Sequence, residues 1–333
     1  MPETCLPPKI RVSVGSAMVL ELMNGKLDAS PTTVYLLTYC EGKCSANCGF
    51  CSQARTSTSH ADLLSRVTWP TFPTQQVVSK IASAWQKKTI QRVCIQGINY
   101  PGVFDDLLVL TTTIVSQANV PVSVSCQPLN ELQMKMLAEA GINRVSVALD
   151  AATEELFNKV KGALICGPYN WDKQRKTLKE AVQIFGKGSV STHLIVGLGE
   201  TECQLIETVQ WCVESGVYPS LFAFTPISGT AFEGLSQPSI ASYRRIQLAR
   251  YLIVSGKTRF KNMKFDNDGR VINFGVSSSL LGKVVESGTP FQTSGCLGCN
   301  RPYYNEKPGG PIYNYPRLLT PNELNEVEKA LEI

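Results

Sequence analysis

The sequence predicts an α/β fold, either a TIM-type (βα)8 barrel or a nearly closed one, with N- and C-terminal extensions. Short runs of β-forming residues alternate at least six times with helical stretches, which implies parallel strands joined by right-handed crossovers. A length of 333 residues, 43% of them hydrophobic, suits one such barrel with additions. We therefore expect an N-terminal extension over residues 1–30, a barrel over 31–295, and a C-terminal segment with a final helix over 296–333.

The expected elements follow the chain with few gaps. A helix is expected within residues 12–22 and the first barrel strand at 33–38, and no GxGxxG of a doubly wound sheet follows that strand. Later strands are expected at 92–96, 120–126, 144–150, 190–196 and 220–225, and helices at 74–88, 104–117, 130–141, within 153–186, from 201, and at 239–254. Beyond residue 254 the pattern weakens, and 263–265, 271–274 and 290–293 are candidate last strands.

Helix starts carry their own signals. Three pairs have the hydroxyl or amide cap with an acid or amide three residues later: Asn130 with Gln133, Thr201 with Gln204, and Thr320 with Glu323.

Composition excludes several classes of protein. No apolar run approaches the 18 residues of a membrane helix, and the N-terminus lacks the basic start and apolar stretch of a secretory signal. The net charge of +5 is spread along the chain without a basic run, which argues against a nucleic-acid surface. We expect a cytoplasmic protein whose twelve cysteines serve metal binding more than disulfides.

One loop after the first strand carries a metal-binding pattern, with Cys44, Cys48 and Cys51 at spacings of three and two residues. Three such thiolates can hold three corners of a cubane [4Fe–4S] cluster, and the fourth iron stays open to a small chelating molecule. A zinc ribbon would bring a second cysteine pair at short range, and a ferredoxin module would supply a fourth cysteine nearby. Cys40 lies close upstream, and Ser52 follows the loop where a ferredoxin would continue.

Two predicted strands have polar interior faces. Ser146 and Asp150 share one face of the strand at 144–150, and Asp150 stands at the carboxyl end, where barrel enzymes keep functional groups. A helix N-cap is the other interpretation of Asp150. On the strand at 190–196, His193 shares a face with Ser191 and is either a ligand or a hydrogen-bonded core histidine.

The loop pattern, with the aromatic Phe50 before the last cysteine, resembles the signature of radical S-adenosylmethionine (SAM) enzymes. The resemblance implies a radical-SAM barrel, a [4Fe–4S] cluster, and SAM chelated to the open iron. It also assigns further cofactor contacts. Gln96 and Asn99 stand where the family holds the SAM amino group, and Ile195, Gly197 and Glu200 match the GxIxGxxE segment beside the adenine, with Leu194 in place of its first glycine.

A narrower resemblance covers most of residues 33–230 and is to biotin synthase, where three barrel cysteines and an arginine hold an auxiliary iron–sulfur cluster. Cys94 and Cys126 match two of these cysteines, and Ser191 replaces the third. Cys296 and Cys299 would complete four thiolates for a second iron–sulfur cluster, a [4Fe–4S] cluster, unless this CxxC forms a zinc knuckle. Further candidates for this ligand set are Cys40, His193, Arg270, Ser294 and Arg301.

The C-terminal GCLGCNRPYYNE segment, together with this barrel, resembles the two-protein type of lipoyl synthase. The resemblance implies a radical SAM sulfurtransferase that adds sulfur to an octanoyl chain on a lipoyl domain or glycine-cleavage H protein. It implies as partners a related radical SAM subunit and an electron donor such as ferredoxin or flavodoxin. Biotin synthase, a maturase of the hydrogenase or methylornithine synthase kind, and a non-catalytic electron carrier are the alternatives.

Overall fold

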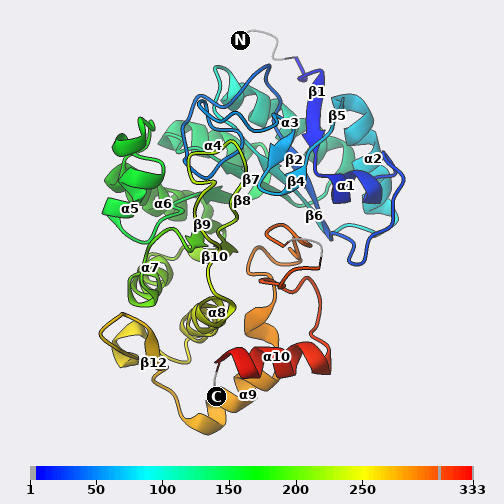
Figure 1. Ribbon diagram of the computed structural model, residues 1–333. Helices are drawn as coiled ribbons and strands as arrows, with labels where there is room; N and C mark the ends of the chain where they lie inside the picture. Colours follow the sequence, from blue (N-terminus) through cyan, green and yellow to red (C-terminus); the bar gives the residue numbers. More distant parts are fainter. Residues whose placement is uncertain (1–4, 307–308, 332–333) are drawn as a thin grey trace.

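The computed structural model describes residues 5–306 and 309–331. Its main sheet has eight strands in the order β10-β9-β8-β7-β6-β2-β1-β5 (Figure 1). The six parallel strands are β2 (Thr33–Leu37), β6 (Arg92–Gln96), β7 (Val122–Cys126), β8 (Ile142–Val147), β9 (Val190–Val196) and β10 (Tyr218–Ala223). β1 (Lys9–Val12) and β5 (Thr71–Pro73) extend the β2 edge in antiparallel pairing.

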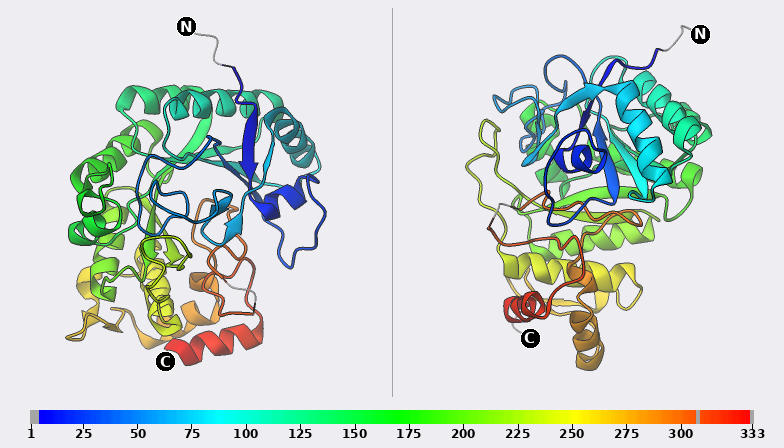
Figure 2. Two further views of the ribbon diagram at one scale, coloured as in Figure 1. Left: turned by 45° about the horizontal axis from the view of Figure 1, so that its top comes forward. Right: turned by 90° about the vertical axis from the view of Figure 1, so that its right-hand side faces the viewer.

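Most helices lie on the outer face of this sheet, whereas the last two in the chain pack against other helical segments beyond it (Figures 1 and 2). The helices are α1 (Val14–Val19), α2 (Thr74–Gln86), α3 (Val103–Ala118), α4 (Glu131–Glu139), α5 (Glu154–Val160), α6 (Trp171–Phe185), α7 (Glu202–Glu214), α8 (Ile240–Val254), α9 (Ser278–Glu286) and α10 (Pro321–Leu331), with short 3-10 turns at Ala163–Ile165, Phe260–Asn262 and Thr289–Phe291. The predicted capping boxes of α4 and α7 are confirmed, because in both the side chains and backbones of the paired residues bond reciprocally. Thr320 and Glu323 bond in the same way at α10.

The sheet curves without closing, since β10 and β5 are its unpaired edges among the described residues. The nearly closed form is therefore the observed one, with six parallel strands instead of eight. The candidate last strands do not extend it. β11 (Lys264–Phe265) and β12 (Val271–Asn273) form a separate hairpin, and the stretch at 290–293 begins inside a 3-10 turn. Residues 12–22 hold only the short α1, because β1 takes the preceding residues into the sheet.

The strands divide their side chains between two environments. Valines and isoleucines such as Val93, Ile95 and Val124 point outward into a core shared with α2, α3 and α4. The alternate residues point inward. Because Gln96 pairs with Ser125, Ser125 with Ser146, and Ser146 with Ser191, a polar row crosses the concave face.

The C-terminal segment crosses the open side of the sheet (Figure 2). At one flank Ser294 Oγ accepts a hydrogen bond of 2.8 Å from Leu221 N on β10. At the other flank Arg92 of β6 donates to Leu297 O at 3.2 Å, and the backbone N–H of Thr32 donates to Asn300 Oδ1 at 3.0 Å. The segment thus joins strands from both ends of the parallel array, near the amino ends of β2 and β6.

A second small hairpin lies outside the main sheet. This hairpin, β3 (Leu63–Leu64) with β4 (Val67–Thr68), touches the C-terminal segment where Ser65 Oγ donates to Tyr304 O at 3.3 Å. In the part of the chain that the structure describes, no helix has the length and apolar character needed to cross a membrane.

Candidate active site

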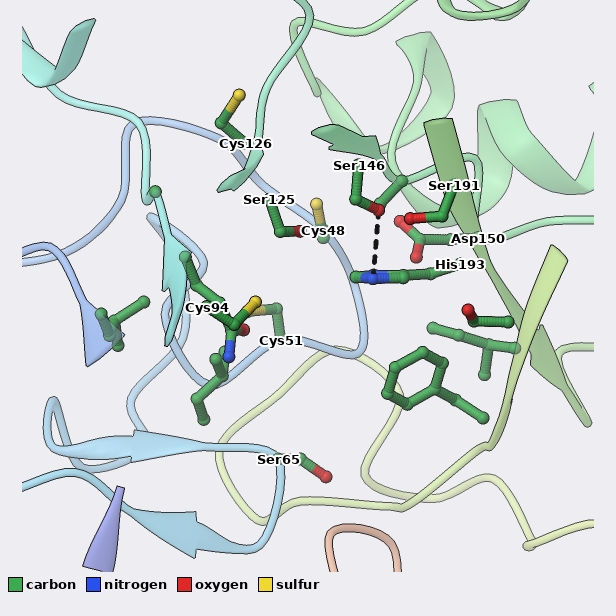
Figure 3. A pocket seen from close by; sticks show the side chains of 18 of the residues that line it. Cys48, Cys51, Ser65, Cys94, Ser125, Cys126, Ser146, Asp150, Ser191 and His193 are labelled. Carbon is green, nitrogen blue, oxygen red and sulfur yellow. Dashed lines mark hydrogen bonds between the residues drawn. The ribbon is translucent and has the colours of Figure 1, made fainter. Parts of the chain in front are cut away.

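One cavity of about 280 Å³ lies on the concave face of the sheet (Figure 3). Its border includes the loop cysteines Cys44, Cys48 and Cys51 and, from other parts of the chain, Cys94, Cys126, Cys296 and Cys299. The polar row from Gln96 to Ser191 borders it as well. The loop cysteines and the C-terminal cysteines therefore border the same cavity, although they are about 250 positions apart in sequence.

The cysteine loop, residues 44–51, is held by hydrogen bonds to its neighbours. Ser45 N donates to Asn99 O at 2.8 Å, and Gly49 N donates to Val160 O at 2.8 Å. Asn47 Nδ2 donates to Ile165 O at 2.7 Å. A Cβ at Gly49 would lie 2.8 Å from both Ile165 and Phe232, so only glycine fits this close approach.

The three loop thiols lie in a low-dielectric setting. Cys44 Sγ accepts hydrogen bonds from the backbone N–H groups of Asn99 at 3.1 Å and Ala46 at 3.4 Å, the type of contact that stabilises a thiolate ligand. Burial raises the pKa of Cys51 to about 12, and burial also raises the pKa of Cys48. These thiols keep their protons until a metal displaces them.

Among residues 5–306 and 309–331, no three Cys, His, Asp or Glu side chains converge closely enough for a single metal ion. The loop cysteines are thus arranged more widely than the ligands of one zinc ion. Three thiolates of one loop can instead ligate three separate irons of a cubane.

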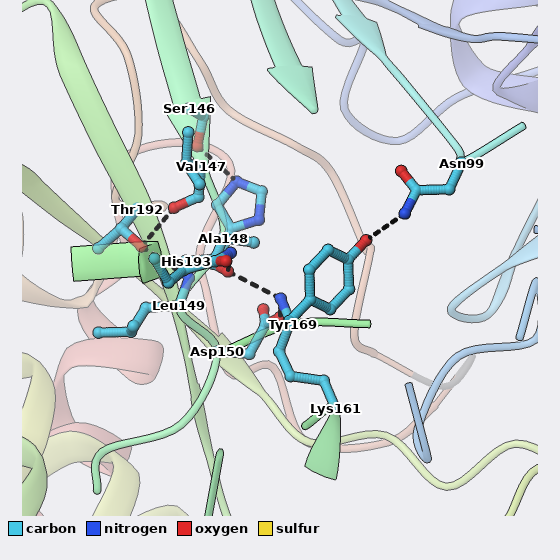
Figure 4. Close-up of polar contacts among 11 residues, drawn as sticks. Asn99, Ser146, Val147, Ala148, Leu149, Asp150, Lys161, Tyr169, Thr192 and His193 are labelled. Carbon is cyan, nitrogen blue, oxygen red and sulfur yellow. Dashed lines mark hydrogen bonds and ion pairs between the residues drawn. The ribbon is translucent and has the colours of Figure 1, made fainter. Parts of the chain in front are cut away.

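A buried ion pair lies beside the loop (Figure 4). Lys161 Nζ donates to Asp150 Oδ2 at 2.7 Å and to Ala148 O at 2.8 Å, and the two charged side chains are only 4% and 7% exposed. Burial alone would lower the pKa of Lys161, but Asp150 and Cys48 outweigh burial and the net pKa is raised. The ammonium also lies 4.6 Å from the centre of the Tyr169 ring, whose hydroxyl accepts from Asn99 Nδ2 at 2.8 Å.

Asp150 holds this position through an unusual backbone. Its φ of 66° is left-handed, a conformation that Asp tolerates better than most residues. Its N–H donates to His193 O, and its carbonyl accepts from Ile195 N, both at 2.8 Å. The N-cap interpretation of Asp150 is wrong, because Thr153 caps α5.

The glycine-rich turn after β9 is stapled by Glu200. Its two carboxylate oxygens accept from Gly197 N at 2.6 Å and from Leu198 N at 3.0 Å. Burial raises the pKa of Glu200, against the effect of these backbone donors. Ile195 borders the cavity from β9, and Phe50 packs beside Ile195 and Phe224, so an apolar wall adjoins the turn.

His193 lies on the cavity wall. Its Nε2 is 3.4 Å from Ser146 Oγ, and its ring lies 4.8 Å from that of Phe222. Burial lowers the pKa of His193 to about 4, so the imidazole is neutral at pH 7. Arg301 also contacts this phenylalanine, with its Cζ 3.8 Å from the centre of the Phe222 ring.

The second cysteine set consists of Cys94, Cys296 and Cys299. Burial raises the pKa of the Cys94 thiol, and the nearby Cys296 and Cys299 raise it further, which reflects their proximity. Tyr35 OH lies 3.3 Å from Cys299 Sγ and accepts from Arg301 N at 3.0 Å. A Cβ at Gly295 would lie 3.0 Å from Cys299 Sγ. The CxxC turn is therefore packed tightly against β2 and β6.

Cys126 does not join this set, which corrects our expectation that it points into the barrel beside Cys94. Cys94 pairs with Ser123, and Gln96 with Ser125, so Cys126 follows an inward residue and points to the outer face. It belongs to the apolar core with Val122 and Val124, although it borders the edge of the cavity. In Figure 3 its sulfur points away from Cys94, Cys48 and Cys51.

The remaining candidates for a ligand role divide in two. Ser191, His193 and Arg301 border the cavity. Cys40 and Ser294 are not among its bordering residues, and neither is Arg270, which precedes β12 of the separate hairpin. Ser294 instead binds the β10 edge.

Sequence reasoning missed Lys161, Tyr169 and Tyr35. Lys161 follows α5 directly and Tyr169 stands in the connection before α6, where no motif marks them. Tyr35 could have been found, because it alternates with Val34 and Leu36 on the same strand that leads into the cysteine loop.

The chain is similar to known proteins over more than half of its length. The family described as "Radical SAM superfamily" matches residues 41–212, more than half of the chain. A biotin synthase of Clostridium beijerinckii is 25% identical over 256 residues, which are 73% of this chain and 75% of that protein.

Two solved structures share the fold. Methylornithine synthase aligns with a TM-score of 0.53 and 15% identity over 73% of this chain and 67% of its own. The FeFe-hydrogenase maturase HydG from Carboxydothermus hydrogenoformans aligns with a TM-score of 0.50 and 17% identity over 73% of this chain and 55% of its own. The matched region contains the cysteine loop, the polar row and the ion pair, and on this basis the chain belongs to the radical SAM superfamily.

Proposed function

We propose that this chain inserts sulfur into an unactivated carbon of an octanoyl chain, as one component of a two-protein lipoyl synthase. The observation that carries the proposal is the single cavity that borders both the cysteine loop and a second set of cysteines. A second set of thiolates on the same cavity supplies ligands for a second cluster, which could donate sulfur beside the radical site. The octanoyl assignment rests on the resemblance of the GCLGCNRPYYNE segment.

As a radical SAM enzyme, the chain uses a [4Fe–4S] cluster and SAM. The residues fit these groups, because the three loop thiols border the cavity together and Cys44 Sγ already accepts two backbone N–H groups. When bound, the cluster and SAM supply a reductively generated carbon radical that removes a hydrogen atom from the substrate. Cys44, Cys48 and Cys51 would hold the cluster.

The chain's own polar groups suit a zwitterionic cofactor. Among the residues that border the cavity, Lys161 and Asn99 offer donors, and Asp150 and Gln96 offer acceptors. The staple formed by Glu200 keeps the Gly197 turn and the apolar wall in place. In this proposal these groups bind and orient the cofactor, and the bound cofactor and substrate displace water from around the radical.

The second set, Cys94, Cys296 and Cys299, would hold an auxiliary iron–sulfur cluster as the sulfur donor. Its place beside β6 and the CxxC turn lets a substrate in the cavity reach both cysteine sets. Apolar side chains offer the acyl chain a surface that water does not wet, among them Leu37, Leu64 and Ile98.

The partners of this reaction follow from the same proposal. They are an octanoylated lipoyl domain or glycine-cleavage H protein, a related radical SAM subunit that installs the other sulfur, and a ferredoxin or flavodoxin as electron donor. A cytoplasmic location suits oxygen-sensitive clusters and such partners.

Biotin synthase is the second candidate, favoured by the 25% identical relative. An anaerobic assay with SAM and a reductant decides between them by offering either an octanoyl-lysine peptide or dethiobiotin. We expect 5′-deoxyadenosine and a thiolated peptide with the first substrate, with greater yield when the related subunit is present. Sulfur insertion into dethiobiotin alone would overturn the proposal.

A further inference from the structure

Four cysteines beyond the loop border the cavity, and one of them, Cys126, belongs to the outer core at the cavity's edge. Strand pairing puts Cys94 opposite Ser123, and Gln96 opposite Ser125, on the inner face. Cys126 is one residue beyond Ser125, and side chains alternate along a strand. Within β7, Cys126 therefore follows the side of Val122 and Val124, which face the outer core.

The surroundings of Cys126 also differ from those of the other three. It is packed in the outer core, where its Cβ would lie 3.3 Å from a Cβ built on Gly97. Burial is the sole cause that raises its pKa, to about 12, whereas the pKa of Cys94 also responds to Cys296 and Cys299. Cys126 is therefore a buried core thiol apart from the cluster of three.

The three remaining cysteines are fixed by independent contacts. Cys299 N donates to Cys296 O at 2.9 Å, which sets the CxxC turn. Arg92 Nη1 donates to Leu297 O between the two cysteines, and Tyr35 OH lies 3.3 Å from Cys299 Sγ. These contacts leave no room for a fourth cysteine from the C-terminal segment, whose described part contains only these two.

Cationic groups lie beside the three thiols. Arg92 Nε donates to Ser123 Oγ at 3.1 Å, opposite Cys94 on the next strand, and Arg301 N donates at 3.0 Å to Tyr35 OH, which lies beside Cys299 Sγ. Arg301 borders the cavity. Positive charge beside an open iron favours a small anion, and iron in a sulfur environment favours a soft sulfur ligand.

We propose that the second cluster is held by only three thiolates, those of Cys94, Cys296 and Cys299, and that its fourth iron takes up a small anionic sulfur ligand from the cavity, such as hydrosulfide. This rests on the proposed function, since it assumes that the second cluster exists. The exchangeable position then lies on the side that the substrate approaches.

The test uses the full chain with the loop cysteines removed, C44A/C48A/C51A, so that only the second cluster can form. After anaerobic reconstitution with iron-57 and sulfide, we expect about four irons per chain in this background, the content of one cubane. Adding C126A keeps this content, adding C94A reduces it at least fourfold, and C212A, at another fully buried thiol, serves as the matched control.

Mössbauer spectra of the background chain then test the open position, with ethanethiolate as the probe. We expect the signal of one iron in four to change when the probe is added. If C126A loses iron as C94A does, or if the probe changes no iron, the inference is overturned. Because the Mössbauer measurement keeps Cys126, it stands even if C126A fails to fold. If the background chain binds no cluster, the sulfur-donor part of the proposed function itself falls.

Discussion

Replacing Lys161 with methionine removes the cation of the buried pair at the cavity. Its ammonium lies 2.7 Å from Asp150 Oδ2, and both side chains are more than nine-tenths buried. Removal leaves a buried carboxylate without its partner, which costs about 3–5 kcal/mol in comparable pairs. The variant also loses the hydrogen bond from Lys161 to Ala148 O. We therefore expect the free energy of unfolding to decrease by about 3–5 kcal/mol or more.

The chain offers a matched control two residues away. Lys159 bonds Glu155 at 2.6 Å, but both side chains are more than half exposed, and solvent screening leaves such a surface pair with little effect on stability. Urea unfolding of the metal-free protein, followed by circular dichroism, measures both variants. D150N/K161M should recover part of the loss, because it removes both charges. An unfolding midpoint for K161M no lower than that of K159M would refute the reasoning.

Three further predictions follow from the site. In G49A the new Cβ meets Ile165 and Phe232 at 2.8 Å. The free energy of unfolding should therefore decrease by about 1–3 kcal/mol, and iron binding by the loop should weaken. G234A, whose Cβ would have no atom within 4 Å, should leave both unchanged. The pKa of His193 is lowered to about 4 from 6.5, so the unfolded chain takes up a proton at higher pH than the folded chain. The free energy of unfolding should therefore decrease by about 1.4 kcal/mol per pH unit as the pH drops from 6.5 to about 4. H193Q should remove this slope, and H60Q should not. Y35F removes the hydroxyl beside Cys299 Sγ, so the reduction potential of the second cluster should shift in a titration followed by electron paramagnetic resonance, while Y313F, outside the cavity, should not move it.

Much of the fold could be predicted because its signals are local. Alternating β and α patterns predicted the six parallel strands, and capping pairs such as Asn130 with Gln133 marked helix starts that the structure confirms. The C-terminal part resisted prediction, because short β-prone stretches at 263–265 and 271–274 have no pattern that says which sheet they join. Tertiary packing decides that, and it made them a separate hairpin.

The site divides in the same way. The spacing of Cys44, Cys48 and Cys51 is a property of one loop and could be recognised from sequence alone. Lys161 could not be recognised, because its part in the site is the ion pair with Asp150, and the left-handed turn after β8 brings Asp150 near it. Cys126 was misjudged for a physical reason: matching cysteines by strand ignored the alternation that turns it outward from Ser125.

The central claim, that a second cluster beside the radical site donates the sulfur, is tested most directly by isotope labelling. The full chain is reconstituted with sulfur-34 sulfide, freed of excess sulfide, and given SAM, reductant and an octanoyl-lysine peptide for a single turnover. We predict that the thiolated peptide carries sulfur-34, and that C296A/C299A still cleaves SAM but yields no thiolated product. Unlabelled sulfur in the product, or full product yield from C296A/C299A, would contradict the account.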